Sequence, residues 1–187
     1  MNHPARAPTP DDRALFEAFQ AGDDGAFELL YGRYRERASA YAWRLLRRRE
    51  EAEEVVTEAF IRVVEGAWRP TGSFKSYLFT VVHRLCVDRI RRQRTRARFL
   101  PFLRRAAGEA MDPEAALLCD PRSRALEEAL SGLPEEHRAA VLLFYGQDMS
   151  SKEVAEVLGC SDQQVRSQLS YARRRLRKEL KNTTEAP

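Results

Sequence analysis

Residues 150–176 read SSKEVAEVLGCSDQQVRSQLSYARRRL, and this stretch holds two helix starts in close succession. Ser150 is followed three residues later by Glu153. The same spacing separates Ser161 from Gln164. A serine with an acidic or amide residue three positions on forms a capping box, which satisfies backbone N–H groups that the first helical turn leaves unpaired. The stretch therefore predicts two helices, one directly after each serine.

A tight turn is expected between these two helices. Gly159 can adopt the left-handed conformation that ends a helix. Ala155, four residues earlier, is small enough to let two helices cross closely, and Val165, six residues after the glycine, is placed to pack between them. Any three small helices around a glycine turn share part of this pattern. Together with the caps and the arginines, however, the spacing predicts a DNA-binding helix-turn-helix from Ser151 to Ser170.

The second of these helices is expected to lie in the major groove. Its buried positions are Val165, Leu169, Ala172, Leu176 and Leu180. Arg166 and Gln164 carry donors that can read guanine and adenine edges, and the arginines further on suit phosphate contacts. The residues expected at the DNA are Ser161, Asp162, Gln163, Gln164, Arg166, Ser167, Ser170, Tyr171, Arg173 and Arg174.

The net charge of +4 hides a strong separation of basic and acidic residues along the chain. Residues 84–105 hold nine arginines against one aspartate, and residues 166–181 hold seven basic residues against one glutamate. Residues 108–136 hold eight acidic residues against two arginines. Two basic blocks on either side of an acidic stretch favour two nucleic-acid contacts joined by a linker. The alternative is a pair of ordinary solvated helix faces, which normally mix lysine with glutamate.

Periodicity predicts an all-α fold. Apolar residues recur every three to four positions in residues 27–45, 52–64 and 74–85, as in amphipathic helices. Residues 66–73 contain two glycines and a proline and are expected to form a loop, with Ser73 placed to cap the helix that follows. No stretch alternates strictly with a period of two.

Two small helical domains are expected from these patterns. The first comprises residues 13–97 and the second residues 123–182. Residues 98–122, which contain three prolines and a glycine and lack a sustained period, are expected to form a flexible linker. Residues 1–12 and 183–187 are expected to be flexible tails.

Composition excludes several classes of protein. The longest apolar runs span only a few residues, whereas a membrane helix needs about 20. The start MNHPARAPTPDD lacks the apolar stretch of a secretory signal. Three cysteines at unrelated spacings do not predict a disulfide framework. We therefore expect a cytoplasmic protein without membrane insertion.

The chain resembles bacterial sigma factors of the extracytoplasmic-function (ECF) class, group 4 of the sigma-70 family, from Asp24 to Leu180. One part of the resemblance is EEAEEVVTEAFIRVV followed by GSFKSYLFTVVHRLCVDRIRRQR, and the other is SGLPEEHRAAVLLFYGQDMSSKEVAEVLGCSDQQVRSQLSYARRRLRKEL. The resemblance implies a factor that binds core RNA polymerase. It would read the promoter −35 element as duplex through the second domain, and melt and read the −10 element through the first.

The resemblance also assigns the first domain's contacts. The helix from Glu54 to Val64 would dock on a coiled coil of the largest polymerase subunit, and its acidic outward face suits an arginine-bearing partner. The residues implied at this contact are Glu54, Val55, Thr57, Glu58, Phe60, Ile61 and Val64.

The loop and helix from Thr71 to Arg92 are similar to the family's −10 reader, which traps a base flipped out of the promoter. The residues carried over are Phe74, Lys75, Ser76, Arg84, Asp88, Arg91 and Arg92. The chain departs from the family at three positions: relatives commonly have asparagine in place of Arg84, and arginines are frequent in place of Gln168 and Tyr171.

No catalytic motif is found. His83 and Cys86 have the spacing of a helical metal pair, but they lack the second pair of ligands that a structural zinc site uses. We expect no catalytic residue, metal, cofactor or small-molecule substrate. The partners implied are core RNA polymerase, promoter DNA and an inhibitory anti-sigma factor. The rival interpretations are a helix-turn-helix repressor or activator that acts without polymerase, and a small nuclease or recombinase, for which no carboxylate-histidine cluster is visible.

Overall fold

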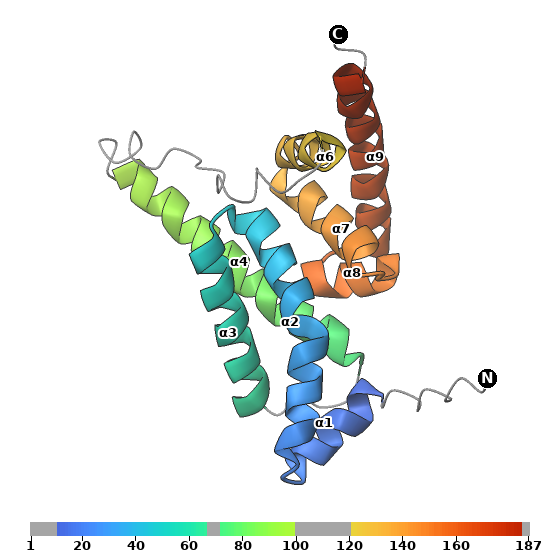
Figure 1. Ribbon diagram of the computed structural model, residues 1–187. Coiled ribbons are helices and arrows are strands. Elements are labelled where there is room, and N and C mark those ends of the chain that lie inside the picture. Colours follow the sequence, from blue (N-terminus) through green and yellow to red (C-terminus); the bar gives the residue numbers. More distant parts are fainter. Residues whose placement is uncertain (1–10, 67–71, 100–120, 185–187) are drawn as a thin grey trace, which may run out of the picture.

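The computed structural model describes residues 11–66, 72–99 and 121–184, which form helices and no strands, as the sequence predicts (Figure 1). The first half consists of α1 (Asp12–Gln20), α2 (Asp24–Leu46), α3 (Arg49–Glu65) and α4 (Phe74–Phe99). The second half consists of α6 (Pro121–Ser131), α7 (Glu135–Gly146), α8 (Ser151–Leu158) and α9 (Asp162–Thr184).

The first half is a bundle in which α2 contacts α1, α3 and α4. Asp23 caps α2 by accepting a hydrogen bond from Ala26 N, and Ser73 Oγ caps α4 by accepting one from Ser76 N at 3.3 Å. The expected cap at Ser73 is thus confirmed. The largest fully buried side chains of the bundle are Leu30, Tyr41, Val55, Val63, Phe74, Leu78, Phe79 and Val82.

Helices extend into two segments that were expected to be irregular, the N-terminal tail and the linker. Asp12 was expected in the N-terminal tail, but it lies in the first turn of α1, where it pairs with Arg33 and accepts a hydrogen bond from the Tyr34 hydroxyl. Helix α4 runs to Phe99 and α6 begins at Pro121, so helix extends into both ends of the expected linker. Most of that linker, residues 100–120, lies outside the described residues, as do most of the expected tails.

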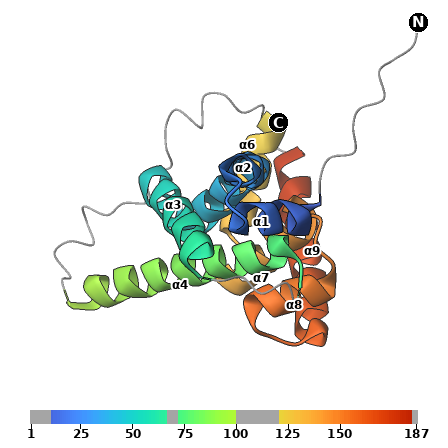
Figure 2. The ribbon, with the colours of Figure 1, turned by 90° about the horizontal axis from the view of Figure 1, so that it is seen from below.

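The second half is built on α9, which contacts α6, α7 and α8. Helix α7 ends at Gly146, and Pro134 occupies its N-cap position. The two halves are not separate bodies: α2 contacts α7, and α4 contacts α8. In Figures 1 and 2 the start of α4 lies beside α8 in both views. None of the described helices combines the length and apolarity needed to cross a membrane.

His83 is a structural residue of the bundle. The Tyr41 hydroxyl lies 2.9 Å from His83 Nδ1 and is hydrogen-bonded to it, and burial raises the pKa of Tyr41 well above its ordinary value, so the hydroxyl stays protonated. A buried tyrosine hydroxyl normally needs such a partner. Burial lowers the pKa of His83 to about 4, which keeps the imidazole neutral at neutral pH. Within the described residues no group of three or more ligating side chains surrounds His83 or Cys86.

This burial predicts a pH dependence of stability. Between pH 6.5 and about pH 4 the unfolded chain protonates His83 while the folded chain does not. The free energy of unfolding should therefore fall as pH is lowered through this window, by on the order of 1–3 kcal/mol from this residue. Urea denaturation of the chain and of His83→Gln, which keeps an acceptor but does not titrate, should isolate this fall. Parallel pH profiles for the two proteins would contradict the prediction.

Candidate nucleic-acid interface

Both capping boxes of the helix-turn-helix are present. Ser150 Oγ accepts from Glu153 N at 3.3 Å while Glu153 Oε2 accepts from Ser150 N at 2.8 Å. Ser161 and Gln164 repeat the arrangement, at 3.2 Å and 2.9 Å. The first turns of α8 and α9 are therefore fixed by their capping-box side chains, as predicted.

The turn between α8 and α9 also has the expected geometry. Gly159 has φ +66°, and the following Cys160 N donates to Ala155 O at 3.0 Å, which closes the left-handed C-cap. Ala155 is buried, and Val165 is fully buried where the helices cross. This confirms the packing predicted from the spacing.

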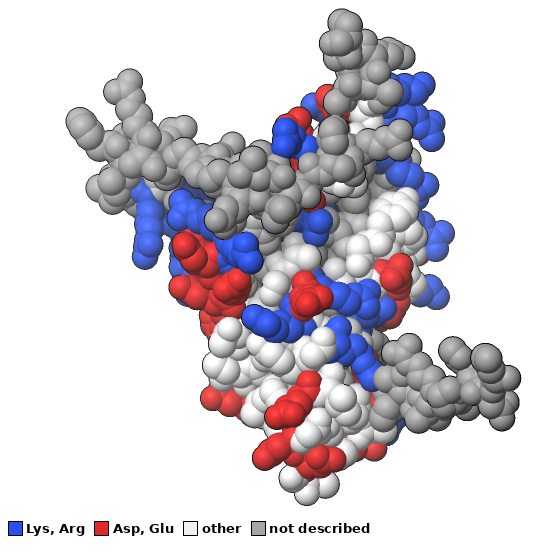
Figure 3. All heavy atoms as spheres, viewed as in Figure 1, with Lys and Arg blue, Asp and Glu red and all other residues white. Residues whose placement is uncertain are grey.

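The residues expected at DNA lie along one side of α9. Lys and Arg side chains project in a row beside this helix in Figure 3. Of the residues expected at DNA, the following are exposed: Ser161, Gln163, Gln164, Arg166, Ser167, Ser170, Tyr171, Arg173 and Arg174. Gln164 Oε1 already accepts from Ser161 N and Oγ, so its amide nitrogen is the group that can donate to a base.

Asp162 is half-buried and lies against Arg166. Its carboxylate accepts from Arg166 Nη2 at 2.8 Å. A hydrogen bond from Ser151, followed by the contact with Arg166, holds the pKa of Asp162 below its ordinary value, so the carboxylate is charged. The Arg166 side chain remains 67% exposed. The tyrosine among the expected contacts, Tyr171, packs its ring on His137 of α7 with the centroids 4.6 Å apart.

The seven residues expected at the −10 element divide into three groups on α4: four exposed, two buried and one half-buried. Arg84, Asp88, Arg91 and Arg92 are exposed, and their spacing places them on one face of the helix. Phe74 and Ser76 are buried, at 1% and 6% exposure.

Phe74 packs on Phe16 and Tyr34, with ring centroids 5.9 and 5.5 Å away. Phe74 and Ser76 therefore anchor the start of α4 in the bundle and do not reach the surface in this structure. The last of the seven, Lys75, is half-buried and donates to the carbonyl oxygens of Gln147 and Asp148 from the second half.

The residues expected at polymerase also divide between core and surface. Val55 and Phe60 of α3 are 0% and 3% exposed, so they support the helix from inside. Thr57, Ile61 and Val64 are exposed. Leu29 of the neighbouring α2 was not among the expected contacts, and it is 57% exposed. Its position offered a signal, because it lies on the opposite side of the helix from the apolar face that Phe27, Leu30 and Tyr34 share.

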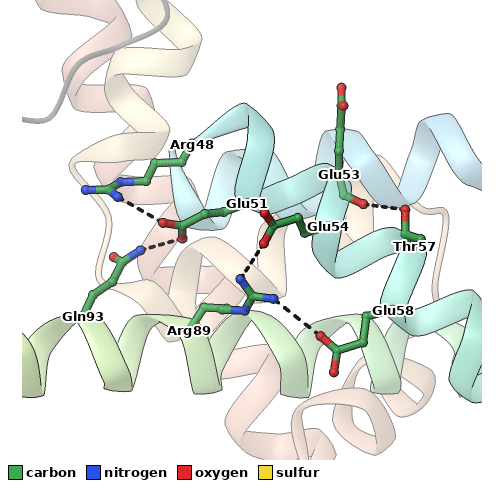
Figure 4. Close-up of polar contacts among 8 residues, drawn as sticks. All are labelled: Arg48, Glu51, Glu53, Glu54, Thr57, Glu58, Arg89 and Gln93. Atoms are coloured by element: carbon green, nitrogen blue, oxygen red, sulfur yellow. Dashed lines mark hydrogen bonds and ion pairs between the residues drawn. The ribbon is translucent and has the colours of Figure 1, made fainter.

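The acidic side of α3 makes polar contacts with α4. Arg89 of α4 points between two glutamates of α3, with Nη1 2.8 Å from Glu54 Oε2 and Nη2 3.5 Å from Glu58 Oε2 (Figure 4). Gln93 of α4 donates to Glu51 at 2.6 Å. Arg89 therefore takes up part of the negative charge of Glu54 and Glu58, because α4 runs along this side of α3.

Two family models match the chain, one on each half. The model described as Sigma-70 region 2 matches residues 30–96, and the model described as Sigma-70, region 4 matches residues 123–176. The first covers most of α2 through α4, and the second runs from α6 into α9.

Curated relatives match over most of the chain. The ECF RNA polymerase sigma factor SigE of Mycolicibacterium smegmatis is 32% identical over 175 residues, which cover 90% of this chain and 67% of the relative. The ECF RNA polymerase sigma factor SigM of Mycobacterium tuberculosis (strain H37Rv) is 30% identical over 168 residues, with coverages of 88% and 82%. The RNA polymerase sigma-H factor of Pseudomonas aeruginosa is 29% identical over 184 residues, with coverages of 90% and 93%.

Two solved structures share the fold at low identity. The sigma factor RpoE of Bartonella quintana, solved in complex with the anti-sigma factor NepR, has a TM-score of 0.65 at 20% identity, covering 83% of this chain and 96% of RpoE. CnrH, solved in complex with the cytosolic domain of CnrY, has a TM-score of 0.69 at 21% identity, with coverages of 91% and 97%.

The left-handed turn at Gly159 predicts a large difference between two glycine-to-alanine changes. An alanine at Gly159 has room for its Cβ, but the φ of +66° should cost about 1–2 kcal/mol of unfolding free energy. Gly146 also has room but has no positive φ, so Gly146→Ala should be neutral or slightly stabilising. Urea denaturation of the two variants measures the difference, and equal effects would contradict the assigned turn.

Proposed function

The chain belongs to the ECF class of the sigma-70 family, and on this premise we propose that it is a transcription initiation factor that binds core RNA polymerase and directs it to promoters. The observation that carries the proposal is the presence of both family regions, in order, on one chain. A regulator that acts only on duplex DNA would need the second half alone.

In the second half, α9 reads the −35 element as duplex. A helix whose N-terminus is fixed by a capping box and a left-handed turn can be held in the major groove without a further ordering cost. Arg166 is oriented by Asp162 and remains 67% exposed, so its guanidinium is available to a guanine edge. The arginines further along, Arg173 and Arg174, contact phosphates.

In the first half, the exposed face of α4 meets the −10 element. Arg84, Arg91 and Arg92 supply positive charge along one helix face, which suits a DNA backbone. Opening the promoter requires unstacked bases to be trapped, because pairing and stacking oppose it by a few kcal/mol for each flipped base. The arginine at position 84 changes the hydrogen-bond donors available at the place where relatives commonly carry asparagine.

Helix α3 supplies the polymerase contact. Ile61 and Val64 on α3 are 50% and 44% exposed, and Leu29 lies on the adjacent α2. Exposed apolar side chains bordered by charged ones are typical of protein-binding surfaces. The contact therefore combines these three side chains with Glu54 and Glu58.

The factor performs no chemistry of its own and works in the cytoplasm, where the polymerase is. An anti-sigma factor is a further partner, since RpoE, which has the same fold, was solved in complex with the anti-sigma factor NepR. The rival function is a repressor or activator that acts without polymerase. It explains the second half, but it gives no role to the proposed polymerase-binding surface of α3 or to the exposed arginines of α4.

Reconstitution distinguishes the two functions. The purified chain added to core RNA polymerase should produce transcripts from discrete starts on genomic DNA, which neither component makes alone. Mapping the starts gives both promoter elements. Tight binding of duplex DNA by the chain alone, with no effect on polymerase, would favour the repressor instead.

Replacing Arg166 tests its assignment as a base reader. Arg166→Ala should weaken binding to the mapped −35 element by about 1–3 kcal/mol and weaken binding to scrambled duplex much less. Arg174→Ala, a matched change at an expected phosphate contact, should weaken binding to both duplexes equally. Competition binding at fixed salt measures all four values. An equal loss on both duplexes for Arg166→Ala would reassign it to phosphate.

A further inference from the structure

Two exposed side chains near the start of α9 are each held by a neighbour within the protein. Gln164 Oε1 accepts from Ser161 N at 2.9 Å and from Ser161 Oγ at 3.0 Å, which uses both lone pairs of that oxygen. Arg166 Nη2 donates to Asp162 Oδ2 at 2.8 Å, one helical turn earlier. A guanidinium carries five N–H donors, so most of those on Arg166 stay available to a partner.

The carboxylate that holds Arg166 lies at the junction of two helices. Asp162 is the first residue of α9, and its side chain is 32% exposed. A hydrogen bond from Ser151, the first residue of α8, and the charges of Arg166 and Lys152 hold the pKa of Asp162 below its ordinary value. The carboxylate is therefore charged, and contacts with both helices of the helix-turn-helix fix its place beside Arg166.

The arginines expected at phosphates are not held in this way. Arg173 and Arg174 are exposed, and neither has an ion-pair partner within the part of the chain that the structure describes. A long, unrestrained cationic side chain can follow the phosphates of any sequence. Of these three arginines, Arg166 alone combines an ion pair with a position in the part of the helix that enters the major groove.

An ion pair of this kind affects specificity more than affinity. A bidentate base contact requires the plane of the guanidinium to be aligned with the base edge, and ordering an unrestrained side chain costs binding energy. A carboxylate at the groove also repels the phosphates of every sequence. Because specificity is a difference between two affinities, both effects increase the preference for the matched base pair.

We propose that Asp162 is a positioning residue for sequence readout, whose ion pair holds the Arg166 guanidinium toward a base edge and away from the neighbouring phosphates. The inference rests on the proposed function of α9 as the reader of duplex DNA. Asp162 acts through Arg166, so it sets how strongly a single base pair is preferred. Without the carboxylate the chain still binds DNA but discriminates less at that base pair.

Four variants and a control isolate this role. Asp162→Asn removes the charge at constant size, and Asp162→Ala removes it without adding a new donor. Arg166→Ala and the double variant complete a mutant cycle. Glu179→Gln is the matched control, because Glu179 pairs with Arg175 at 3.4 Å with the same four-residue spacing on the same helix, roughly 25 Å further along.

Selection of duplexes from a randomised pool, by the full-length chain alone and with core polymerase, measures the preference at each base pair. Arg166→Ala should identify the base pair that it reads, by a loss of preference on the order of tenfold. Asp162→Asn should lower the preference at the same base pair by about two- to fivefold, as expected for one exposed ion pair.

The same variants carry the controls. Asp162→Asn should bind scrambled duplex at least as tightly as the unchanged chain does. Glu179→Gln should keep every preference. In the Arg166→Ala background, Asp162→Asn should change no preference further.

Several outcomes would overturn the inference. One is an unchanged preference at the Arg166 base pair in Asp162→Asn. Another is equal weakening on all sequences, which marks a merely structural role. A third is a lost preference at a different base pair, which would make Asp162 a reader itself. Enrichment of no sequence by the unchanged chain would remove the reader altogether.

The test stays decisive in two further situations. If circular dichroism shows that Asp162→Asn unfolds, Asp162→Ala decides. The transcription assay with core polymerase reports separately on the proposed function, since the selection requires only that the chain binds duplex DNA.

Discussion

Burial of α4 is the constraint on which the rest of the structure depends. This helix contacts α2 and α3 in the first half and α8 in the second, so it is covered on several sides. Its apolar side chains Phe74, Leu78, Phe79, Val82, Leu85 and Cys86 are all buried. A helix that packs against several neighbours has only one narrow face left for polar contacts with a partner. Arg84, Asp88, Arg91 and Arg92 occupy that face, which is why the exposed candidates for promoter binding form a single row.

The same burial accounts for the acidic side of α3. Because α4 lies along α3, Arg89 is placed between Glu54 and Glu58 and takes up part of their charge. Exposed ion pairs of this kind contribute little to stability, about 0–1 kcal/mol. In this protein these ion pairs reduce the negative charge that Glu54 and Glu58 present to a partner. An arginine-bearing partner would have to compete with Arg89 for these two carboxylates.

The helix-turn-helix could be predicted in detail because its determinants are local. The caps at Ser150 and Ser161 act on backbone N–H groups three residues away, and Gly159 acts on its own backbone. Val165 needs only one neighbouring helix to be buried. The expected contacts of the first half were less well predicted, since resemblance identified the helices but not their faces. Phe74, Val55 and Phe60 were expected at partners, and packing placed all three inside.

The sequence by itself determined the all-helical class, the two family regions, the helix caps and the separation of basic from acidic blocks, since each follows from neighbouring residues or from composition. Only the tertiary structure decided which face of α3 and α4 reaches the surface, and that the two halves meet. Arg37 Nε donates to Gln147 Oε1 across 110 residues of the chain, and neither residue carries a local signal for the other. Such a contact exists only when two folded surfaces are brought together, and that depends on packing that no short stretch of sequence encodes.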